Sequence, residues 1–260
     1  MSKNSDPNIG IVIPARLGGV RLPGKVLLDF HGLPMIEHVR RRGLLNSFDV
    51  PVIVASGDED ILKVVQNFGG TTIKSERDHT SGMSRTGEAA ERLGFDYYLV
   101  LQGDEILSLP RHIDQMISRI RSHGVTTAIN AITPLDDESE LKDVSIVKCL
   151  LDCDQRILSM FRNSPLISAN SIQMNLVKKV SGLFAFSKQG LKSVLQSKPQ
   201  PLEINESIEQ MRILELGYQL DSVLLDKNLA SVNLPRDVQL VEKSMASDPE
   251  QIAILKEILK

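Results

Sequence analysis

The stretch IGIVIPARLGGVRLPGK, residues 9–25, decides the fold of this chain. Residues 9–13 are a continuous apolar run after a polar start, which is typical of a buried strand in a parallel sheet. Residues 14–25 follow as a loop that holds three cations and three glycines. Open α/β sheets bind their ligands beyond the carboxyl ends of the strands. The sequence therefore predicts a ligand-binding loop directly after the first strand.

The composition of this loop indicates an anion site. Its glycines allow backbone N–H groups to approach oxyanions closely, and Arg16, Arg21 and Lys25 can neutralise phosphates. The loop is neither a Walker A sequence nor a GxGxxG loop. The alternative is a solvated basic loop, in which glycines would have little reason to alternate with cations.

Strands and helices alternate outward from the loop. The pattern predicts further strands over residues 51–55, 71–74 and 97–101, and helices over residues 34–45, 58–68 and 110–123. Strand and helix in turn at this spacing argue for a parallel sheet with right-handed crossovers. The expected fold class is therefore α/β.

The apolar positions predict which side of each helix faces the core. In the first two helices the inward residues are expected to be Met35, Ile36, Val39 and Leu44, then Ile61, Leu62 and Val65. A last amphipathic helix is expected over residues 248–259. Its inward residues would be Ile252, Leu255 and Leu259.

The pattern changes in the second half of the chain. Residues 144–151 and 156–161 are rich in β-forming residues and flank a polar turn, which predicts an antiparallel hairpin. Such a hairpin is either a dimer arm or an edge of the sheet, and both readings stay open. A strand over residues 180–186 and a helix over residues 205–216, ended by Gly217, complete the pattern.

Composition and charge limit the function. The chain has 260 residues, 42% apolar and 24% charged, so a globular fold is expected rather than disorder. It carries 30 basic and 33 acidic residues, and a formal charge of −3 provides no bulk basic field for nucleic acid. Cys149 and Cys153 cannot build a disulfide framework, and without a second pair they argue against zinc. No apolar run or leader predicts a membrane segment or signal peptide. We expect one soluble, cytoplasmic domain over residues 1–260.

The turn Gln102-Gly103-Asp104-Glu105 directly follows a predicted strand. A carboxylate at the carboxyl end of a strand, across from a phosphate loop, is well placed to hold Mg²⁺. Acidic turns after strands are common, so this signal alone would be weak. The basic loop in the same chain strengthens it, and Asp104 is the predicted metal ligand.

The segment HTSGMSR, residues 79–85, offers hydroxyl and backbone groups to a base or a ribose. Without context it precedes a helix in which Ser81 or Ser84 is the N-cap and Glu88 lies in the first turn. A histidine such as His79 is more often structural than catalytic.

The order and spacing of these segments resemble the CMP-Kdo synthetases, the 3-deoxy-manno-octulosonate cytidylyltransferases. The resemblance runs over residues 11–241. The matching stretches are IPARLGGVRLPGKVL (13–27), GLPMIEHV (32–39), VIVASGDEDI (52–61), HTSG (79–82), LQGDE (101–105), VKCLLDCDQRILSMFR (147–162) and ESIEQMRILELG (206–217). Together they are specific for the wider family of CMP-sugar-acid synthetases, and less specific for the sugar.

The resemblance implies a Rossmann-like nucleotidyltransferase sheet with an antiparallel hairpin arm, residues 144–162, used in a homodimer. It also implies a reaction in which the anomeric hydroxyl of a sugar acid attacks the α-phosphorus of CTP. The products would be a CMP-sugar, for lipopolysaccharide biosynthesis, and pyrophosphate, with Mg²⁺ as cofactor. The protein's task would be positioning and charge neutralisation.

The same resemblance assigns roles by position. On the nucleotide side it assigns the triphosphate to Arg16, Arg21 and Lys25, the cytidine to Ser81 and Gly82, and Mg²⁺ to Asp104. On the sugar side it places Gln102 by the sugar, and Glu209 and Gln210 on a helix that borders the sugar pocket.

The chain departs from the family pattern at several positions. Val20 stands where a serine or threonine is usual, Ser84 where an acidic residue is usual, and Ser181 where a histidine precedes a glycine. Asn233 occupies the place of a second metal-binding aspartate. The segment between Arg162 and Val180 is shorter than usual and lacks a tryptophan-acidic motif.

These departures predict that CTP is kept and that the acceptor differs from ordinary Kdo. A modified octulosonate, for example an amino-substituted one, or another 2-keto-3-deoxy acid would fit. Two alternatives remain. One is a weakly active or non-catalytic homologue that binds nucleotide, for which Asn233 is the best support. The other is a nucleotidyltransferase that acts on a different acid.

Overall fold

The computed structural model describes residues 6–19, 21–163 and 171–260. The chain forms two compact units. Unit 1 consists of Met1–Ser118 and Leu229–Lys260, and unit 2 of Arg119–Asn228. The assignment of a single domain over residues 1–260 stays a prediction. Val20 and residues 164–170, which are part of the short segment between Arg162 and Val180, lie outside the described residues.

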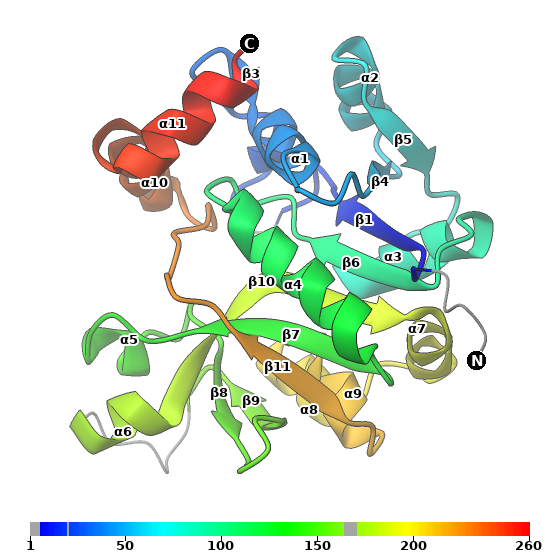
Figure 1. Ribbon diagram of the computed structural model, residues 1–260, viewed down its shortest axis with the longest axis vertical. Helices are drawn as coiled ribbons and strands as arrows, with labels where there is room; N and C mark the ends of the chain where they lie inside the picture. Colours follow the sequence, from blue (N-terminus) through cyan, green and yellow to red (C-terminus); the bar gives the residue numbers. More distant parts are fainter. Residues whose placement is uncertain (1–5, 20, 164–170) are drawn as a thin grey trace. The chain divides into compact units, whose positions relative to one another are not determined.

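Unit 1 is built on a parallel sheet (Figure 1). Its strands, in spatial order, are β6 (Tyr97–Leu101), β1 (Ile9–Pro14), β4 (Val52–Ser56) and β5 (Thr71–Lys74). In β1, Ile11 lies opposite Val52 on one side and Leu99 on the other. The apolar runs are buried because helices cover a parallel sheet on both faces. All four strands agree with the sequence prediction to within one residue.

Among the residues that the structure describes, six helices belong wholly or partly to unit 1. They are α1 (Met35–Leu44), α2 (Glu59–Asn67), α3 (Gly82–Arg92), the start of α4 (Pro110–His123), α10 (Pro235–Ser247) and α11 (Pro249–Ile258). A short 3-10 turn, η1 (Lys25–Leu27), and the two-residue strands β2 (Asp29–Phe30) and β3 (Leu33–Pro34) lie before α1. The predicted inward face of α2 is confirmed, since Ile61, Leu62 and Val65 are buried.

Two predicted helix faces are wrong in part. Leu44 is 48% exposed, because nine residues at 100° each place it on the opposite side of α1 from Met35. In α11 the buried residues are Gln251 and Ile258 rather than the predicted apolar set, of which Leu259 is exposed. The Gln251 amide donates a 2.8 Å hydrogen bond to the Leu107 carbonyl, which fixes this side of the helix inward.

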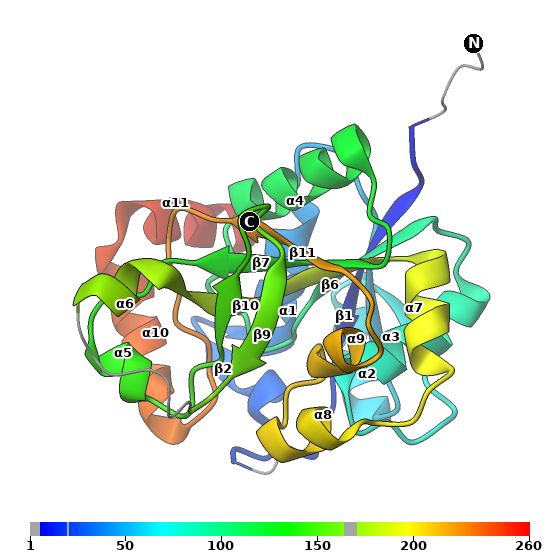
Figure 2. The same cartoon turned by 90° about the horizontal axis from the view of Figure 1, so that it is seen from below.

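Unit 2 contains a mixed sheet and the predicted hairpin (Figure 2). Strand β7 (Ala128–Thr133) lies between β10 (Val177–Ser187), which is antiparallel to it, and β11 (Leu220–Leu224), which is parallel. The hairpin strands β8 (Lys148–Leu151) and β9 (Ile157–Phe161) pair antiparallel, and β8 also pairs with β10. The hairpin is confirmed with shorter strands than predicted. Strands β7 and β11 were not predicted.

Five short helices lie in the described part of unit 2 after β7. They are α5 (Ser139–Lys142), α6 (Ser171–Leu176), α7 (Lys188–Leu195), α8 (Pro201–Glu206) and α9 (Met211–Glu215). The single helix predicted over residues 205–216 is wrong, because Ser207 has a positive φ of 53° that ends α8. The guanidinium of Arg162 donates to the carbonyl of Glu206 at 2.9 Å, which satisfies part of this helix end.

The two cysteines of the hairpin are free thiols in different surroundings. Cys149 is buried in β8, and this burial raises the pKa of its thiol to about 12. Cys153 is exposed in the turn between β8 and β9. Within the described residues, no helix is long and apolar enough to cross a membrane.

Candidate active site

The carboxyl edge of the unit 1 sheet gathers most of the predicted residues. Strands β1, β4 and β6 are parallel neighbours, so the loops that follow them leave the sheet at one edge. These loops carry Arg16, Asp58 and Gln102 with Asp104. Gly103 allows the loop after β6 to lie close to the end of β1, because a Cβ at this position would lie 3.3 Å from the carbonyl oxygen of Pro14.

Lys25 and Asp104 contact each other directly. The Lys25 ammonium donates to Oδ2 of Asp104 at 2.6 Å and to the carbonyl oxygen of Val232 at 2.7 Å. The Val232 amide in turn donates to the Asp104 carbonyl at 3.2 Å. Both charged side chains are 18% exposed. The structure thus joins the predicted triphosphate lysine, the predicted metal ligand and the C-terminal segment in one polar cluster.

Asn233 directly follows the residue that holds Lys25. Its side-chain amide donates to the Ser231 hydroxyl at 2.9 Å, and its backbone amide donates to Asp237 at 2.8 Å. Asp237 also accepts from the Leu234 amide at 2.7 Å and thereby caps α10. The Asp237 carboxylate is therefore engaged at a helix start, and Val232, the residue before Asn233, makes the contacts to Lys25 and Asp104.

The described residues contain no group of three or more His, Cys, Asp or Glu that could hold a metal ion by themselves. A cation nevertheless stands between the Asp104 carboxylate and the Val232 carbonyl, since the Lys25 ammonium occupies that place. Mg²⁺ in nucleotide enzymes commonly uses one or two carboxylates and completes its shell with phosphates and water. Asp104 therefore fits a site that a nucleotide must help to build, and Asn233 stays a predicted second ligand.

The loop after β1 is held in a tight conformation. The amides of Gly19 and Gly24 both donate to the Leu17 carbonyl at 2.8 Å. A Cβ on Gly19 would lie 2.7 Å from the Leu22 carbonyl oxygen, so this position requires glycine. Arg16 and Arg21, which the sequence assigned to the triphosphate, are exposed on this frame. The frame leaves both cations open to an anionic ligand.

Asp58 and Arg85 were not predicted as site residues. Asp58 accepts the Leu17 amide at 2.9 Å through Oδ2, so it fixes the loop after β1 to the loop after β4. Arg85 in α3 is only 7% exposed, and a Cβ on Gly57 would lie 3.5 Å from its Nη1. Burial lowers the pKa of Arg85, an effect that nearby Asp58 opposes. A sequence signal for Arg85 did exist. Arg85 lies four residues before the buried Ala89, so both side chains lie on the same face of α3.

The segment before α3 is ordered by a network around Glu88. Ser81 is the N-cap of α3 and accepts the Ser84 amide at 3.1 Å, as predicted. Glu88 lies in the second turn of α3 rather than the first, where it accepts from His79 and from the Glu76 amide. Burial by itself raises the pKa of Glu88, but these hydrogen bonds outweigh it and lower the pKa to about 2. His79 is therefore a positioning residue for the loop that carries Ser81 and Gly82.

Unit 2 brings the predicted acceptor-side residue Gln210 to the irregular part of β10. The Gln210 amide donates to Oδ1 of Asn130 at 3.2 Å, and the Asn130 amide donates to the Ser181 carbonyl at 3.0 Å. The register of β10 against β7 shifts between Val180 and Phe184, next to this contact. Asn130 was missed because β7 was not predicted.

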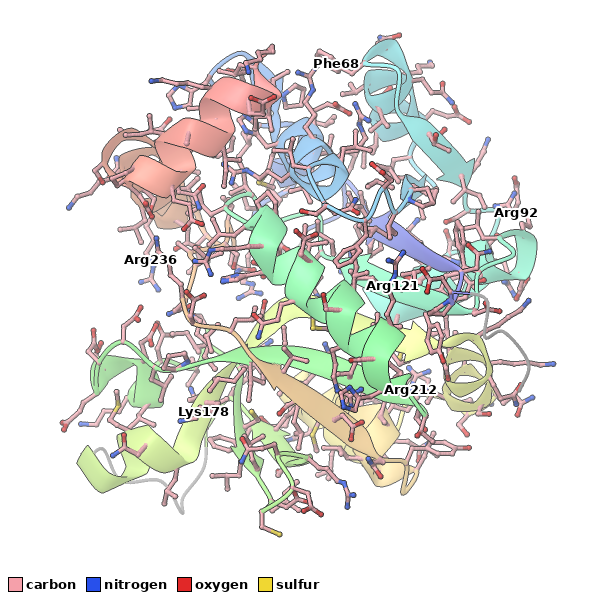
Figure 3. The ribbon with its side chains drawn as sticks, in the orientation of Figure 1. Phe68, Arg92, Arg121, Lys178, Arg212 and Arg236 are labelled. Atoms are coloured by element: carbon pink, nitrogen blue, oxygen red, sulfur yellow. The ribbon has the colours of Figure 1, made fainter. Side chains whose placement is uncertain are left out.

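Glu209 and Gln210 lie in the turn before α9 rather than inside a helix, which corrects the prediction. Arg212, labelled in Figure 3, forms an ion pair with Glu203 at 2.6 Å and supports this turn from the side of α8. A buried ion pair that joins α8 to α9 therefore holds this turn in place.

Comparisons with known proteins agree with this geometry. The family model described as Cytidylyltransferase matches residues 10–222. A 3-deoxy-manno-octulosonate cytidylyltransferase from Chlorobium limicola is 32% identical over 92% of this chain and 97% of its own length. An 8-amino-3,8-dideoxy-manno-octulosonate cytidylyltransferase from Shewanella halifaxensis is 31% identical over 93% of this chain and 100% of its own.

A solved structure extends the agreement from sequence to fold. The CMP:2-keto-3-deoxy-manno-octonic acid synthetase complexed with CTP matches with a TM-score of 0.84 and 31% identity, over 93% of this chain and 99% of that one. The likeness confirms the α/β nucleotidyltransferase fold. The chain therefore belongs to the cytidylyltransferase family and resembles its octulosonate-directed members over more than 90% of its length.

Proposed function

We propose that this protein transfers CMP from CTP to a Kdo-like 2-keto-3-deoxy sugar acid and releases pyrophosphate. The observation that carries the proposal is the cluster at the carboxyl edge of unit 1, where Lys25 contacts Asp104 beside the loop that presents Arg16 and Arg21. The similarity to octulosonate cytidylyltransferases over nearly the whole chain supports this choice of reaction and substrates.

The chemistry follows from the charges at this edge. The anomeric hydroxyl of the acid forms a new O–P bond at the α-phosphorus of CTP, the α–β P–O bond breaks, and the hydroxyl proton passes to solvent. Charge accumulates on the phosphate oxygens and on the departing pyrophosphate. Arg16, Arg21 and Lys25 neutralise that charge, and the Ser81–Gly82 start of α3 offers hydrogen bonds to the cytidine.

We propose Mg²⁺ as the cofactor, held by Asp104 and the side-chain oxygen of Asn233. When bound, the ion would neutralise phosphate oxygens and align the triphosphate. The ion pair of Lys25 with Asp104 opposes metal binding in the free protein, because the ammonium already neutralises the carboxylate. A triphosphate attracts Lys25 and supplies anionic ligands of its own, so nucleotide and metal should bind together.

In this proposal Gln102 is an acceptor-binding residue of unit 1, and Glu209 and Gln210 are acceptor-binding residues of unit 2, each proposed by itself. The Gln210–Asn130–Ser181 contacts are made by neutral amides and a carbonyl. Because relatives of comparable identity are named for both Kdo and its 8-amino form, both acids belong in the test.

The deciding experiment measures pyrophosphate release with CTP, UTP, ATP and GTP against a panel of acids that includes Kdo and 8-amino-Kdo. We expect release only with CTP and an octulosonate, because a buried base edge rejects a base that leaves its partners unpaired. Equal use of all four nucleotides would contradict the cytidylyltransferase function. CTP binding without release for any acid would favour a non-catalytic, nucleotide-binding homologue, and release with a different acid would redefine the acceptor.

We further propose that the protein is a cytoplasmic homodimer that pairs through its hairpin arm. Leu158 on β9 is 62% exposed and Val144, four residues before β8, is 58% exposed, so burial of these apolar side chains against a second copy would be favourable. Sedimentation of the wild type and of Leu158→Glu tests this. A dimeric wild type and a monomeric Leu158→Glu variant would support pairing through the hairpin arm. Two monomeric proteins would reject it.

A further inference from the structure

Arg85 carries a buried positive charge that the assigned roles do not use. It lies in α3, which starts at Ser81 and packs against the strands of unit 1. Arg85 is 7% exposed, and its Nη1 faces Gly57, directly after the carboxyl end of β4. The guanidinium therefore stands at the same edge of the sheet as the loop that follows β1.

The hydrogen-bonding capacity of this guanidinium is unused. Among the described residues, none accepts a hydrogen bond from the Arg85 side chain, although arginine offers five N–H donors in a fixed fork. The nearest carboxylate, Asp58, uses its Oδ2 for the Leu17 amide. Glu88 is engaged by His79 and by the Glu76 amide, and Asp78 is exposed. Arg85 is 7% exposed and has no protein acceptor among the described residues, so its donors are open to a ligand.

The surrounding charges make this place attractive to an anion. Of the charged groups around Arg85, Asp58 and Arg16 have the largest electrostatic effects on its pKa. Glu88 and Asp78 have smaller effects. Asp58 offsets part of this positive charge, and its Oδ2 is already engaged by the Leu17 amide. Arginine is well suited to bind phosphate, because its planar guanidinium can make a bidentate contact to two phosphate oxygens.

We propose that Arg85 is a further nucleotide-binding residue, which binds a phosphate oxygen of the nucleotide together with Arg16. This role rests on the proposed function for the identity of the nucleotide, CTP, but not for the presence of the anion site. It predicts that Arg85 contributes to binding of phosphate groups and not of the nucleoside.

The experiment measures binding of CTP, CMP, cytidine and inorganic pyrophosphate by calorimetry, without acceptor. The variants are Arg85→Gln, Arg85→Lys and, as a matched control, Lys63→Gln, which removes one exposed positive charge from α2 of the same unit. Arg85→Gln should weaken CTP binding by about 10- to 100-fold, the value of a hydrogen bond to a charged group. Cytidine binding should not change, and Lys63→Gln should bind every ligand like the wild type.

Thermal unfolding separates this role from a structural one. Loss of a buried cation that has no acceptor should leave the melting temperature of the free protein unchanged or raise it. The rise in melting temperature that CTP gives should shrink in Arg85→Gln. Arg85→Lys keeps the charge without the fork, so it should fold and bind CTP with intermediate affinity.

Three results would overturn the proposal. The first is that both Arg85 variants bind CTP and pyrophosphate as tightly as the wild type. The second is that cytidine binding and CTP binding weaken equally. The third is that the melting temperature of the free Arg85→Lys protein falls clearly. A wild type that binds CTP but releases no pyrophosphate with any acid would reject the proposed function alone. The binding comparison between wild type and Arg85→Gln would still decide the role of Arg85.

Discussion

The two regions that hold the predicted site residues are built from different chemical groups. At the carboxyl edge of unit 1 the contacts are between full charges, of which the 2.6 Å pair of Lys25 and Asp104 is the centre. In unit 2 the contacts around Gln210 are between neutral groups, with Asn130 at 3.2 Å. Hydrogen bonds that involve a charge contribute roughly twice as much as neutral ones.

Under the proposed function, this difference would give the two regions separate tasks. Charged groups suit the binding of a triphosphate and the charge that develops in phosphoryl transfer. Neutral amides suit the choice between similar sugar acids, because an unpaired amide penalises the wrong acceptor. Substitutions at the edge should therefore change nucleotide binding and rate, while substitutions in the amide cluster should change acceptor preference.

The largest effect is expected from Asp104→Ala. The substitution removes the carboxylate that would hold Mg²⁺, and several kcal/mol of charge stabilisation correspond to about 10³-fold or more in kcat. Titration of turnover with Mg²⁺ measures this, and Asp60→Ala, on the exposed surface of α2, is the control. Full activity in Asp104→Ala would reject the metal assignment. In the same titration, Asn233→Asp should respond at a lower Mg²⁺ concentration than the wild type, since it restores a second carboxylate.

The next effect is expected from Arg21→Ala and Lys25→Ala. Each removes a positive charge assigned to the phosphates, which should lower kcat by about 10²–10³-fold. Arg21 is exposed, so Arg21→Ala should leave the melting temperature close to that of the wild type. A collapse of the melting temperature in Arg21→Ala would mean that this arginine supports the fold, and the loop after β1 would lose its assignment as a phosphate site.

A smaller and differently directed effect is expected from Gln210→Ala. Loss of one neutral hydrogen-bonding side chain should raise KM for the acid by about 10-fold and leave KM for CTP unchanged. Steady-state kinetics with either substrate varied measures the two constants. Gln196→Ala, at the end of α7 in the same unit, serves as the comparison. Equal increases in both KM values would remove the distinction between the two regions.

The smallest effect concerns stability alone. Glu88 has a pKa of about 2 in the folded protein, below its ordinary value of 4.5. Its contribution to stability is therefore complete above pH 4.5 and is lost as the pH falls toward 2. Urea unfolding at several pH values should show a steeper loss of stability over this range in the wild type than in Glu88→Gln. Parallel curves for the two proteins would contradict the lowered pKa.

The sequence predicted unit 1 well because its signals are local. Unbroken apolar runs such as residues 9–13, separated by glycine and proline, can be read without knowledge of distant residues. The predictions for Lys25 and Asp104 placed each of them at a strand end. Their mutual contact could not be read, because it joins two loops 79 residues apart with a third segment near Val232.

Unit 2 was predicted less well because its elements depend on tertiary contacts. Strand β7 contains the polar Asn130, which is satisfied by Gln210 and Ser181 from distant parts of the unit. The helical pattern over residues 205–216 hides the break at Ser207, whose positive φ no composition rule predicts for serine. Arg85 was missed for a related reason: the placement of its side chain beside Gly57 follows from the packing of α3 on the sheet.

The two hairpin thiols give the protein a built-in labelling position. A thiol reacts through its thiolate, so Cys149, buried and with a pKa of about 12, should stay inert near neutral pH. Cys153 lies in the open, in the turn between β8 and β9. A maleimide fluorophore should consequently attach at one place without any mutation. Its emission would then test whether the tip of the hairpin becomes shielded in the proposed dimer.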